Sequence, residues 1–213
     1  MDQHRHAVHT SQIERTLLAL EANQMKGYYL SDIAALIPLL SNLIKPEHVT
    51  SVGGSMTLFE TGVIDWLKSY SGSYLDRYAP DLSAESIKDL YRKCFSADVY
   101  LTSSQAVTEM GELYNVDGRG NRVAAMTFGP EKVIVICGTN KLVTDEAAAI
   151  DRNRRISAPA NAKRLNRKTP CATLGYCTDC KSPDRICVTH VTMKRQVVKD
   201  RIHVILVEGS FGY

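Results

Sequence analysis

The stretch KVIVICG, residues 132–138, constrains the fold more than any other part of the chain. It is apolar at every position between Lys132 and Gly138. A short apolar run without alternation is typical of a strand that is covered on both faces. Strand-like segments alternate with amphipathic helical segments along most of the sequence. This pattern predicts an α/β fold with a mostly parallel sheet flanked by helices.

Local signals place the other elements. Further strands are expected at 28–30, 97–103, 188–193 and 201–209, and HVTSVGG at 48–54 is interpreted as a strand that runs into a glycine turn. Capping residues predict helices that begin near Ser11, Thr57 and Ser83, and another that begins at Thr144 or Asp145 and ends before Pro159. Residues 109–121 contain several turn formers and are interpreted as a long connection.

The 213 residues are expected to form a single α/β domain, 1–213, with an irregular cysteine-rich loop at 160–190. The 26 basic residues nearly balance 23 acidic ones, so no nucleic-acid partner is expected. The N-terminus lacks a secretory signal and no apolar run is long enough to cross a bilayer, which favours the cytoplasm. We expect no membrane association, and self-association into a homo-oligomer stays open.

A glycine loop at residues 51–62 is the first candidate site. Gly53 and Gly54 let backbone amides approach an anion, and the hydroxyls of Ser55 and Thr57 are further donors. A phosphate or a carboxylate suits this chemistry. A plain tight turn before a capped helix explains the same residues equally well.

Polar residues that follow the strand at 97–103 form the second candidate site. Open α/β sheets bind ligands beyond the carboxyl ends of their strands. The expected ligand-binding residues here are Gln105, Asn115, Gly118, Asn121 and Arg122. Glu109 and Asp117 are the candidate catalytic acid and base. The alternative is a hairpin with solvated polar tips.

Asn140 and Lys141 follow the buried strand at 132–138 in the same way. An amide and an ammonium at this position can bind an anionic substrate. Arg152 lies on the next predicted helix and is placed to reach the same crevice. Alternatively, Lys141 extends its ammonium into water, as lysines at strand ends commonly do.

Four of the six cysteines lie within 17 residues, and these are Cys171, Cys177, Cys180 and Cys187. A C-x2-C core with two flanking cysteines supplies the four thiolates that zinc or an iron-sulfur cluster requires. The spacing predicts a metal site without choosing between these two cofactors. A redox pair at Cys177 and Cys180, or four free thiols, are the alternatives, and His190 is a further potential ligand.

Several of these segments together resemble the lactate-utilisation (LUD) domain family. The resemblance rests on five segments, GGSMTLFETGVIDWL, AVTEMGELYNVDGRGNRVAAMTFGPEKVIVICGTNK, APANAKRL, PCATLGYCTDCKSPDRIC and ILVEGSFGY. It implies a fold similar to ribose-phosphate isomerases, glucosamine-phosphate deaminases and coenzyme A transferases. It also implies a role in bacterial oxidation of L-lactate to pyruvate, alongside iron-sulfur proteins. The four-cysteine loop is similar to that of a short, stand-alone branch of the family.

One position departs from the related isomerases. They carry an acidic residue near the position of Gln105, and a neutral amide cannot exchange a proton as a carboxylate does. The leading hypothesis is a protein of organic-acid metabolism that binds a small anionic metabolite. An iron-sulfur electron-transfer or redox-sensing module and a sugar-phosphate or acyl-coenzyme A converting enzyme are the alternatives. The sequence leaves open whether the chain is itself the catalyst or an accessory subunit.

Overall fold

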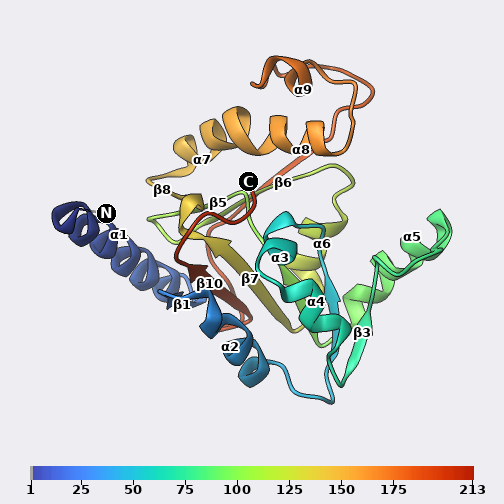
Figure 1. The fold of residues 1–213 in the computed structure, drawn as a ribbon, viewed down its shortest axis with the longest axis horizontal. Coiled ribbons are helices and arrows are strands. Elements are labelled where there is room, and N and C mark those ends of the chain that lie inside the picture. The colour runs from blue at the N-terminus through green and yellow to red at the C-terminus, as the bar shows by residue number, and fades with distance from the viewer. Residues whose placement is uncertain (1) are drawn as a thin grey trace.

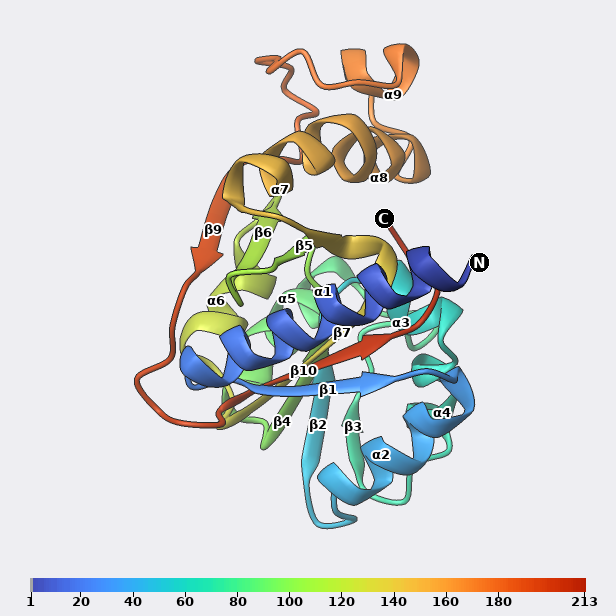
Figure 2. The same cartoon turned by 90° about the vertical axis from the view of Figure 1, so that its left-hand side faces the viewer.

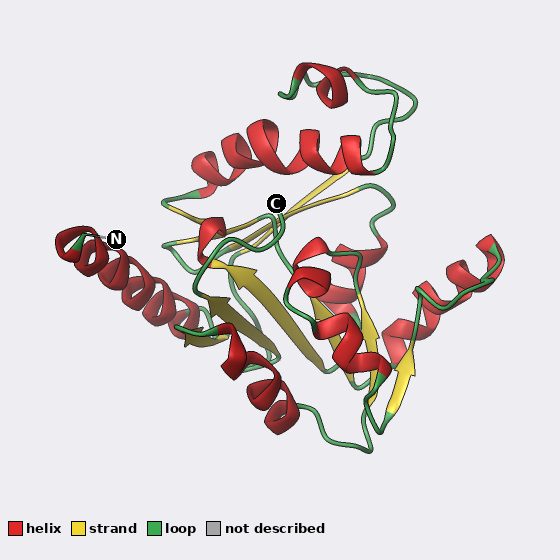
Figure 3. Ribbon diagram, viewed as in Figure 1, coloured by secondary structure: helices red, strands yellow, loops and turns green. Residues whose placement is uncertain are grey.

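The structure, a computed structural model, describes residues 2–213. Its main sheet has six strands in the order β1-β10-β7-β4-β2-β3, and every neighbouring pair is parallel (Figure 1). In that order the strands are Lys26–Leu30, Ile202–Val207, Lys132–Gly138, Val99–Thr102, Val49–Val52 and Ser73–Leu75. Helices flank this sheet on both faces (Figure 3). The predicted α/β fold with a mostly parallel sheet flanked by helices is confirmed, and it is consistent with the isomerase-like and deaminase-like fold that the resemblance implied.

Strand β7 has the two-sided burial that its apolar sequence predicted. Val133, Val135 and Cys137 belong to a core that includes α1 (Gln3–Ala22) and α6 (Asn121–Phe128). Ile134 and Ile136 belong to a second core on the opposite face. That core is completed by α2 (Leu36–Leu43), α3 (Met56–Glu60) and α4 (Val63–Lys68). Because successive side chains of β7 point to opposite faces of the sheet, this one strand packs against the helices on both faces.

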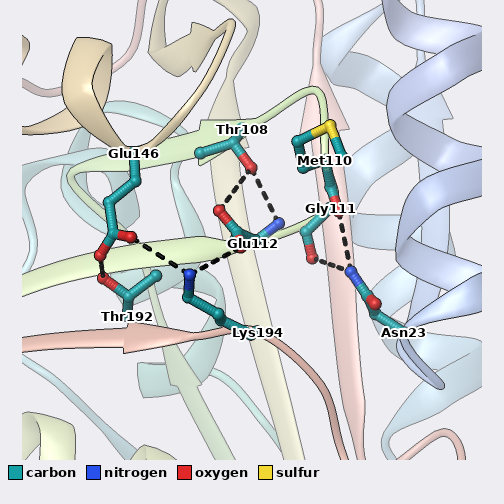
Figure 4. A network of polar contacts seen from close by, with 8 residues as sticks. All are labelled: Asn23, Thr108, Met110, Gly111, Glu112, Glu146, Thr192 and Lys194. Atoms are coloured by element: carbon teal, nitrogen blue, oxygen red, sulfur yellow. Dashed lines mark hydrogen bonds and ion pairs between the residues drawn. The ribbon is translucent and has the colours of Figure 1, made fainter.

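A second sheet was not predicted. Its order is β8-β5-β6-β9, and these strands are Leu142–Val143, Ala106–Thr108, Leu113–Asp117 and Thr189–Met193 (Figure 2). Strands β5 and β6 form an antiparallel hairpin, so the stretch interpreted as a long connection contains a strand. Lys194 forms ion pairs with Glu112 at 3.4 Å and with Glu146 at 3.3 Å (Figure 4). Together they connect the β5–β6 turn to the start of helix α7 (Glu146–Arg152).

A helical layer lies over the carboxyl ends of the main-sheet strands. It consists of α7 (Glu146–Arg152), a π-helical turn (Asn153–Ser157) and α8 (Ala158–Arg164) (Figure 1). Helix α7 ends before Pro159, as expected, but the π-helical turn and α8 continue the helical path, which was not predicted. Pro159 lies in the first turn of α8, directly after the π-helical turn, where a missing N–H is tolerated.

Most predicted helix starts are confirmed, with one shift at the N-terminus. Helix α1 begins at Gln3 and not near Ser11, because the carboxylate of Asp2 accepts hydrogen bonds from the first free N–H groups. Ser83 caps α5 (Ala84–Lys93) and Asp145 caps α7, as expected. Helix α9 (Pro170–Leu174) and three 3-10 turns, Ile33–Ala35, Cys94–Ser96 and Thr139–Lys141, complete the helical elements of residues 2–213. None of the helices described there has both the length and the apolar character needed to cross a membrane.

Candidate functional site

A small cavity of about 50 Å³ lies where strands β2, β4 and β7 end. The segment after each strand contributes part of its wall, and α6, the π-helical turn, α8 and the C-terminal segment supply the remainder. Its lining consists of Gly54, Ser55, Met56, Thr57, Ser103, Ser104, Gln105, Arg122, Lys141, Ser157, Asn161, Arg164 and Tyr213. Three of these residues are cationic and none is acidic. The cavity is therefore suited to an anion.

Lys141 is the most deeply buried cation of the cavity, with 2% of its surface exposed. Its Nζ donates hydrogen bonds to Thr57 Oγ1 at 2.8 Å and to Ser103 Oγ at 3.0 Å. Within residues 2–213 it forms no ion pair with a carboxylate. Burial lowers the pKa of this ammonium to about 8, and the nearby charge of Arg152 acts in the same direction.

Arg122 is a second buried cation, and neutral groups hold its guanidinium. NH1 donates to Asn115 Oδ1 at 2.6 Å and to the Ser103 carbonyl at 2.9 Å. NH2 donates to Gln105 Oε1 at 3.2 Å and to the Val116 carbonyl at 2.9 Å. Burial lowers the pKa of Arg122. These acceptors are uncharged and fix its orientation, while the nearby carboxylate of Asp117 offsets part of its positive charge.

Two buried hydroxyls of the lining have no hydrogen-bond partner. Ser104 is 3% exposed, and its Oγ is unpaired in the part of the chain that the structure describes. The phenol oxygen of Tyr213 is in the same state. Buried polar groups are nearly always hydrogen-bonded, so these two hydroxyls are available to bind a polar group in the cavity.

The comparisons with known proteins agree with this architecture. A family model described as the LUD domain matches residues 13–207. The chain belongs to the LUD domain family. This family is linked to lactate utilisation. The fold is also similar to the crystal structure of a DUF162 family protein from Deinococcus radiodurans, with a TM-score of 0.50, 16% identity, and coverage of 95% of this chain and 98% of that one. No protein with a curated description matches the sequence.

Six sequence-predicted residues of this LUD domain line the cavity, namely Gly54, Ser55, Thr57, Gln105, Arg122 and Lys141. Gly53 lies just behind them, where an added Cβ would be 2.7 Å from Thr102 Oγ1 and 2.9 Å from the Tyr100 hydroxyl. Asn115 is fully buried against Arg122. Asn140 holds the C-terminal segment, because its Nδ2 donates to the Gly212 carbonyl and its Oδ1 accepts from Phe211 N.

Four other predicted residues lie outside the lining of the cavity. Glu109 sits in the β5–β6 turn, where its carboxylate pairs with Arg15 of α1 at 2.7 Å. Asp117 caps α6 by accepting hydrogen bonds from the backbone of Arg122 at 2.9 Å and from two other N–H groups. Gly118 faces the Ile186 backbone, and Asn121 is the first residue of α6. The structure thus places both candidate catalytic residues and two of the expected ligand-binding residues outside the lining of the cavity.

Sequence reasoning missed several lining residues of the LUD domain. Ser103 and Ser104 directly follow β4, so the strand-end argument could have included them. Ser157, Asn161 and Arg164 come from the helical layer, and Tyr213 comes from the C-terminal segment. Arg152, which was expected to reach this crevice, lies behind the lining and donates to the carbonyls of Gln105 at 2.6 Å and Asn140 at 3.2 Å.

The four clustered cysteines line one separate cavity of about 10 Å³ beside α8. All are free thiols, and Cys171 and Cys187 are buried. Within residues 2–213, no set of three or more potential ligand side chains is already arranged to hold a metal ion. His190 is engaged elsewhere, because its Nδ1 lies 2.9 Å from the Tyr114 hydroxyl. The four predicted thiols thus line the same cavity, but they are not arranged as a complete set of metal ligands.

Proposed function

We propose that this LUD protein binds a small organic-acid anion of lactate metabolism in the cavity at the ends of β2, β4 and β7. The observation that supports this most is Lys141, a buried ammonium without a carboxylate partner in residues 2–213. Uncompensated buried charge is costly, and a bound anion would offset that cost. Arg122 and Arg164 add positive charge to the same cavity.

The size and chemistry of the cavity favour a short ligand. Its volume admits a few water-sized groups, on the order of a three-carbon acid. The hydroxyls of Ser55, Ser103 and Ser104 can bind a hydroxyl or a carbonyl group next to a carboxylate. L-lactate and pyruvate have these features. Sugar phosphates and coenzyme A esters belong in the same binding test because the family fold is shared with enzymes that use them.

Thermal unfolding with a panel of anions tests this function. We expect L-lactate or pyruvate to raise the melting temperature, since a ligand at 100 times its Kd stabilises by about 2.7 kcal/mol. The uncharged analogue lactamide should have no effect. Lys141→Met should abolish the stabilisation, whereas Lys132→Met should retain it. Lys132 is a matched control because it is half-buried at the opposite end of β7 and donates to the Leu43 carbonyl at 2.9 Å.

Two results would contradict the proposal. One is an unchanged melting temperature for every anion in the panel, measured well above any plausible Kd. The other is equal stabilisation of the wild type and the Lys141→Met variant. If only sugar phosphates or coenzyme A esters stabilise the protein, the site binds anions but the assignment to lactate metabolism is wrong.

We also propose that the four-cysteine loop binds a metal. The supporting observation is that Cys171, Cys177, Cys180 and Cys187 all line one cavity as free thiols. A backbone group also favours a metal-binding thiolate. The N–H of Asp179 donates a hydrogen bond to Cys177 Sγ at 3.3 Å, which stabilises the negative charge of a thiolate. The number and softness of the donors fit zinc or an iron-sulfur cluster. Zinc would serve as a structural staple, and a cluster would provide electron transfer.

Anaerobic purification with metal and sulfide analysis tests the second proposal. We expect about one zinc or one cluster per chain, and its loss in Cys177→Ser and Cys180→Ser. Cys94→Ser is the control, because Cys94 is buried beside the main sheet and distant from the loop in sequence. A wild-type protein that stays free of metal after anaerobic incubation with zinc, or with iron and sulfide, would contradict a metal site.

A further inference from the structure

The amine of Lys141 is positioned with one bonding direction free. Thr57 Oγ1 donates its own hydrogen to the Phe211 carbonyl, so towards Lys141 it acts as an acceptor. Ser103 Oγ is the second acceptor. These two hydroxyls orient the nitrogen, and neither of them can carry a full negative charge. The third position on the nitrogen is a hydrogen in the ammonium and a lone pair in the neutral amine.

The C-terminal segment passes close to this nitrogen without a side chain. A Cβ added at Gly212 would lie 3.3 Å from Lys141 Nζ and 2.4 Å from Thr57 Oγ1. Gly212 also has a φ of 62°, a conformation that favours glycine. The close contact with Thr57 and this backbone conformation therefore require glycine here, and the C-terminal segment approaches the amine without a side chain of its own.

We propose that Lys141 forms a reversible imine with the carbonyl carbon of a 2-oxo acid bound in the cavity. This inference rests on the proposed function, because it takes pyruvate as the ligand. The neutral amine attacks the carbonyl carbon, a C–N bond forms, and a proton moves from nitrogen to oxygen. The nitrogen lone pair then forms C=N as water leaves with the two amine hydrogens. The step involves no net oxidation or reduction, so no further reactant is needed.

The surroundings favour both partners of this step. Burial lowers the pKa of Lys141 to about 8, so about a tenth of it is neutral near pH 7, against roughly one in three thousand for a lysine with pKa 10.5. Arg122 and Arg164 line the same cavity, and their positive charges favour the carboxylate of the acid. An amine made nucleophilic by burial then lies beside a bound carbonyl.

Reductive trapping tests the imine. The full-length protein is incubated with pyruvate and sodium cyanoborohydride near pH 7, and its mass and proteolytic peptides are measured. We expect one reduced pyruvate unit on Lys141, formed on the order of a hundredfold faster than on exposed lysines, as their neutral fractions predict. L-lactate has no carbonyl and should give no adduct. Lys141→Arg should also give none, whereas Lys132→Arg should react as the wild type does.

The outcomes separate this inference from the function on which it rests. If pyruvate and L-lactate stabilise the wild-type protein but no adduct forms on Lys141, the imine is wrong and anion binding stands. Adducts spread over lysines in proportion to their exposure would also overturn it. If no anion stabilises the protein and no adduct forms, both proposals fail. Peptide mapping of the wild-type protein decides the question even if a Lys141 variant does not fold.

Discussion

Lys141 Nζ donates a 2.8 Å hydrogen bond to Thr57 Oγ1, although 84 residues separate the two in the sequence. The contact is a consequence of sheet order. Strands β2 and β7 both run parallel to β4, which lies between them, so the loops that follow all three meet at one edge. The ammonium that we propose as the anion-binding group is therefore positioned by three buried strands of the main sheet.

Replacing Lys141 by methionine should stabilise the unliganded protein near neutral pH. The folded-state pKa is about 8 and the ordinary value is 10.5, so the unfolded chain binds more protons between these two values. Stability therefore rises with pH across that window, and the penalty is fully present below it. The difference between the two pKa values corresponds to a destabilisation of at most about 3 kcal/mol. The gain from Lys141→Met is smaller than this, because the variant also loses the two hydrogen bonds of the ammonium. Urea unfolding of both proteins near pH 7 measures it.

The same pair of proteins provides a pH test. The gap in unfolding free energy between Lys141→Met and the wild type should shrink as the pH rises from about 8 towards 10.5. A gap that stays constant over this range would show that Lys141 holds its proton as strongly in the folded as in the unfolded state.

Removing the Asn115 side chain should destabilise the protein through Arg122. Asn115 Oδ1 accepts the shortest hydrogen bond of this guanidinium, at 2.6 Å, and both residues are buried. We expect Asn115→Ala to cost about 2 kcal/mol, as is typical for a buried hydrogen bond to a charged group. Asn121→Ala is the matched control, with an expected change within about 0.5 kcal/mol. Equal losses in the two variants, measured by urea unfolding, would contradict this role of Asn115.

Much of the main fold could be predicted because its strands carry strong local signals. The apolar run 132–138 predicts a strand buried on both faces whatever its neighbours are, and α5 begins at the predicted Ser83. The second sheet could not be predicted in this way. Strand β6 lies in a stretch with several turn formers, and its pairing with β9 joins residues that are far apart in the sequence. Pairing of that kind depends on tertiary contacts.

The residues of the candidate site likewise fall into those that could be predicted from the sequence and those that could not. Thr57, Gln105 and Lys141 follow strands, so the rule for parallel sheets predicted that they would meet. Arg164 and Tyr213 reach the cavity from the helical layer and the C-terminal segment, and no local pattern marks them. Glu109 lies beyond a strand of the second sheet, which points its turn towards α1. A sequence shows which residues follow a strand, but it does not show to which sheet that strand belongs.

Asp117 is expected to matter for stability more than for ligand binding. Its carboxylate accepts hydrogen bonds from the N–H groups of Arg122 and Val123, which satisfies free donors at the start of α6, and from the N–H of Gly118 in the preceding loop. Asp117→Ala should therefore cost about 1–2 kcal/mol in unfolding free energy. Glu109→Gln should cost less than about 1 kcal/mol, because its partner Arg15 is exposed. Loss of ligand affinity in a stable Asp117→Asn variant would instead support a direct role at the site.

Two adjacent glycines should respond differently to one added methyl group. At Gly53 a Cβ would lie 2.7 Å from Thr102 Oγ1, 2.9 Å from the Tyr100 hydroxyl and 3.0 Å from Arg122 Cγ. These contacts are too short, so Gly53→Ala must displace buried side chains at a cost of about 1–3 kcal/mol. At Gly54 the nearest atom would be a nitrogen of Arg77 at 3.6 Å, an ordinary contact. Gly54→Ala should therefore change stability by less than about 1 kcal/mol.

The displacement at Gly53 should also reach the cavity. Arg122 Cγ is one of the atoms that must move, and Arg122 lines the anion site. We expect Gly53→Ala to weaken the stabilisation by L-lactate or pyruvate in thermal unfolding, and Gly54→Ala to weaken it much less. If Gly53→Ala unfolds and binds as the wild type does, the loop after β2 can relax without disturbing Arg122. In that case the close packing of this glycine against β4 and α6 is not what holds the anion site in shape.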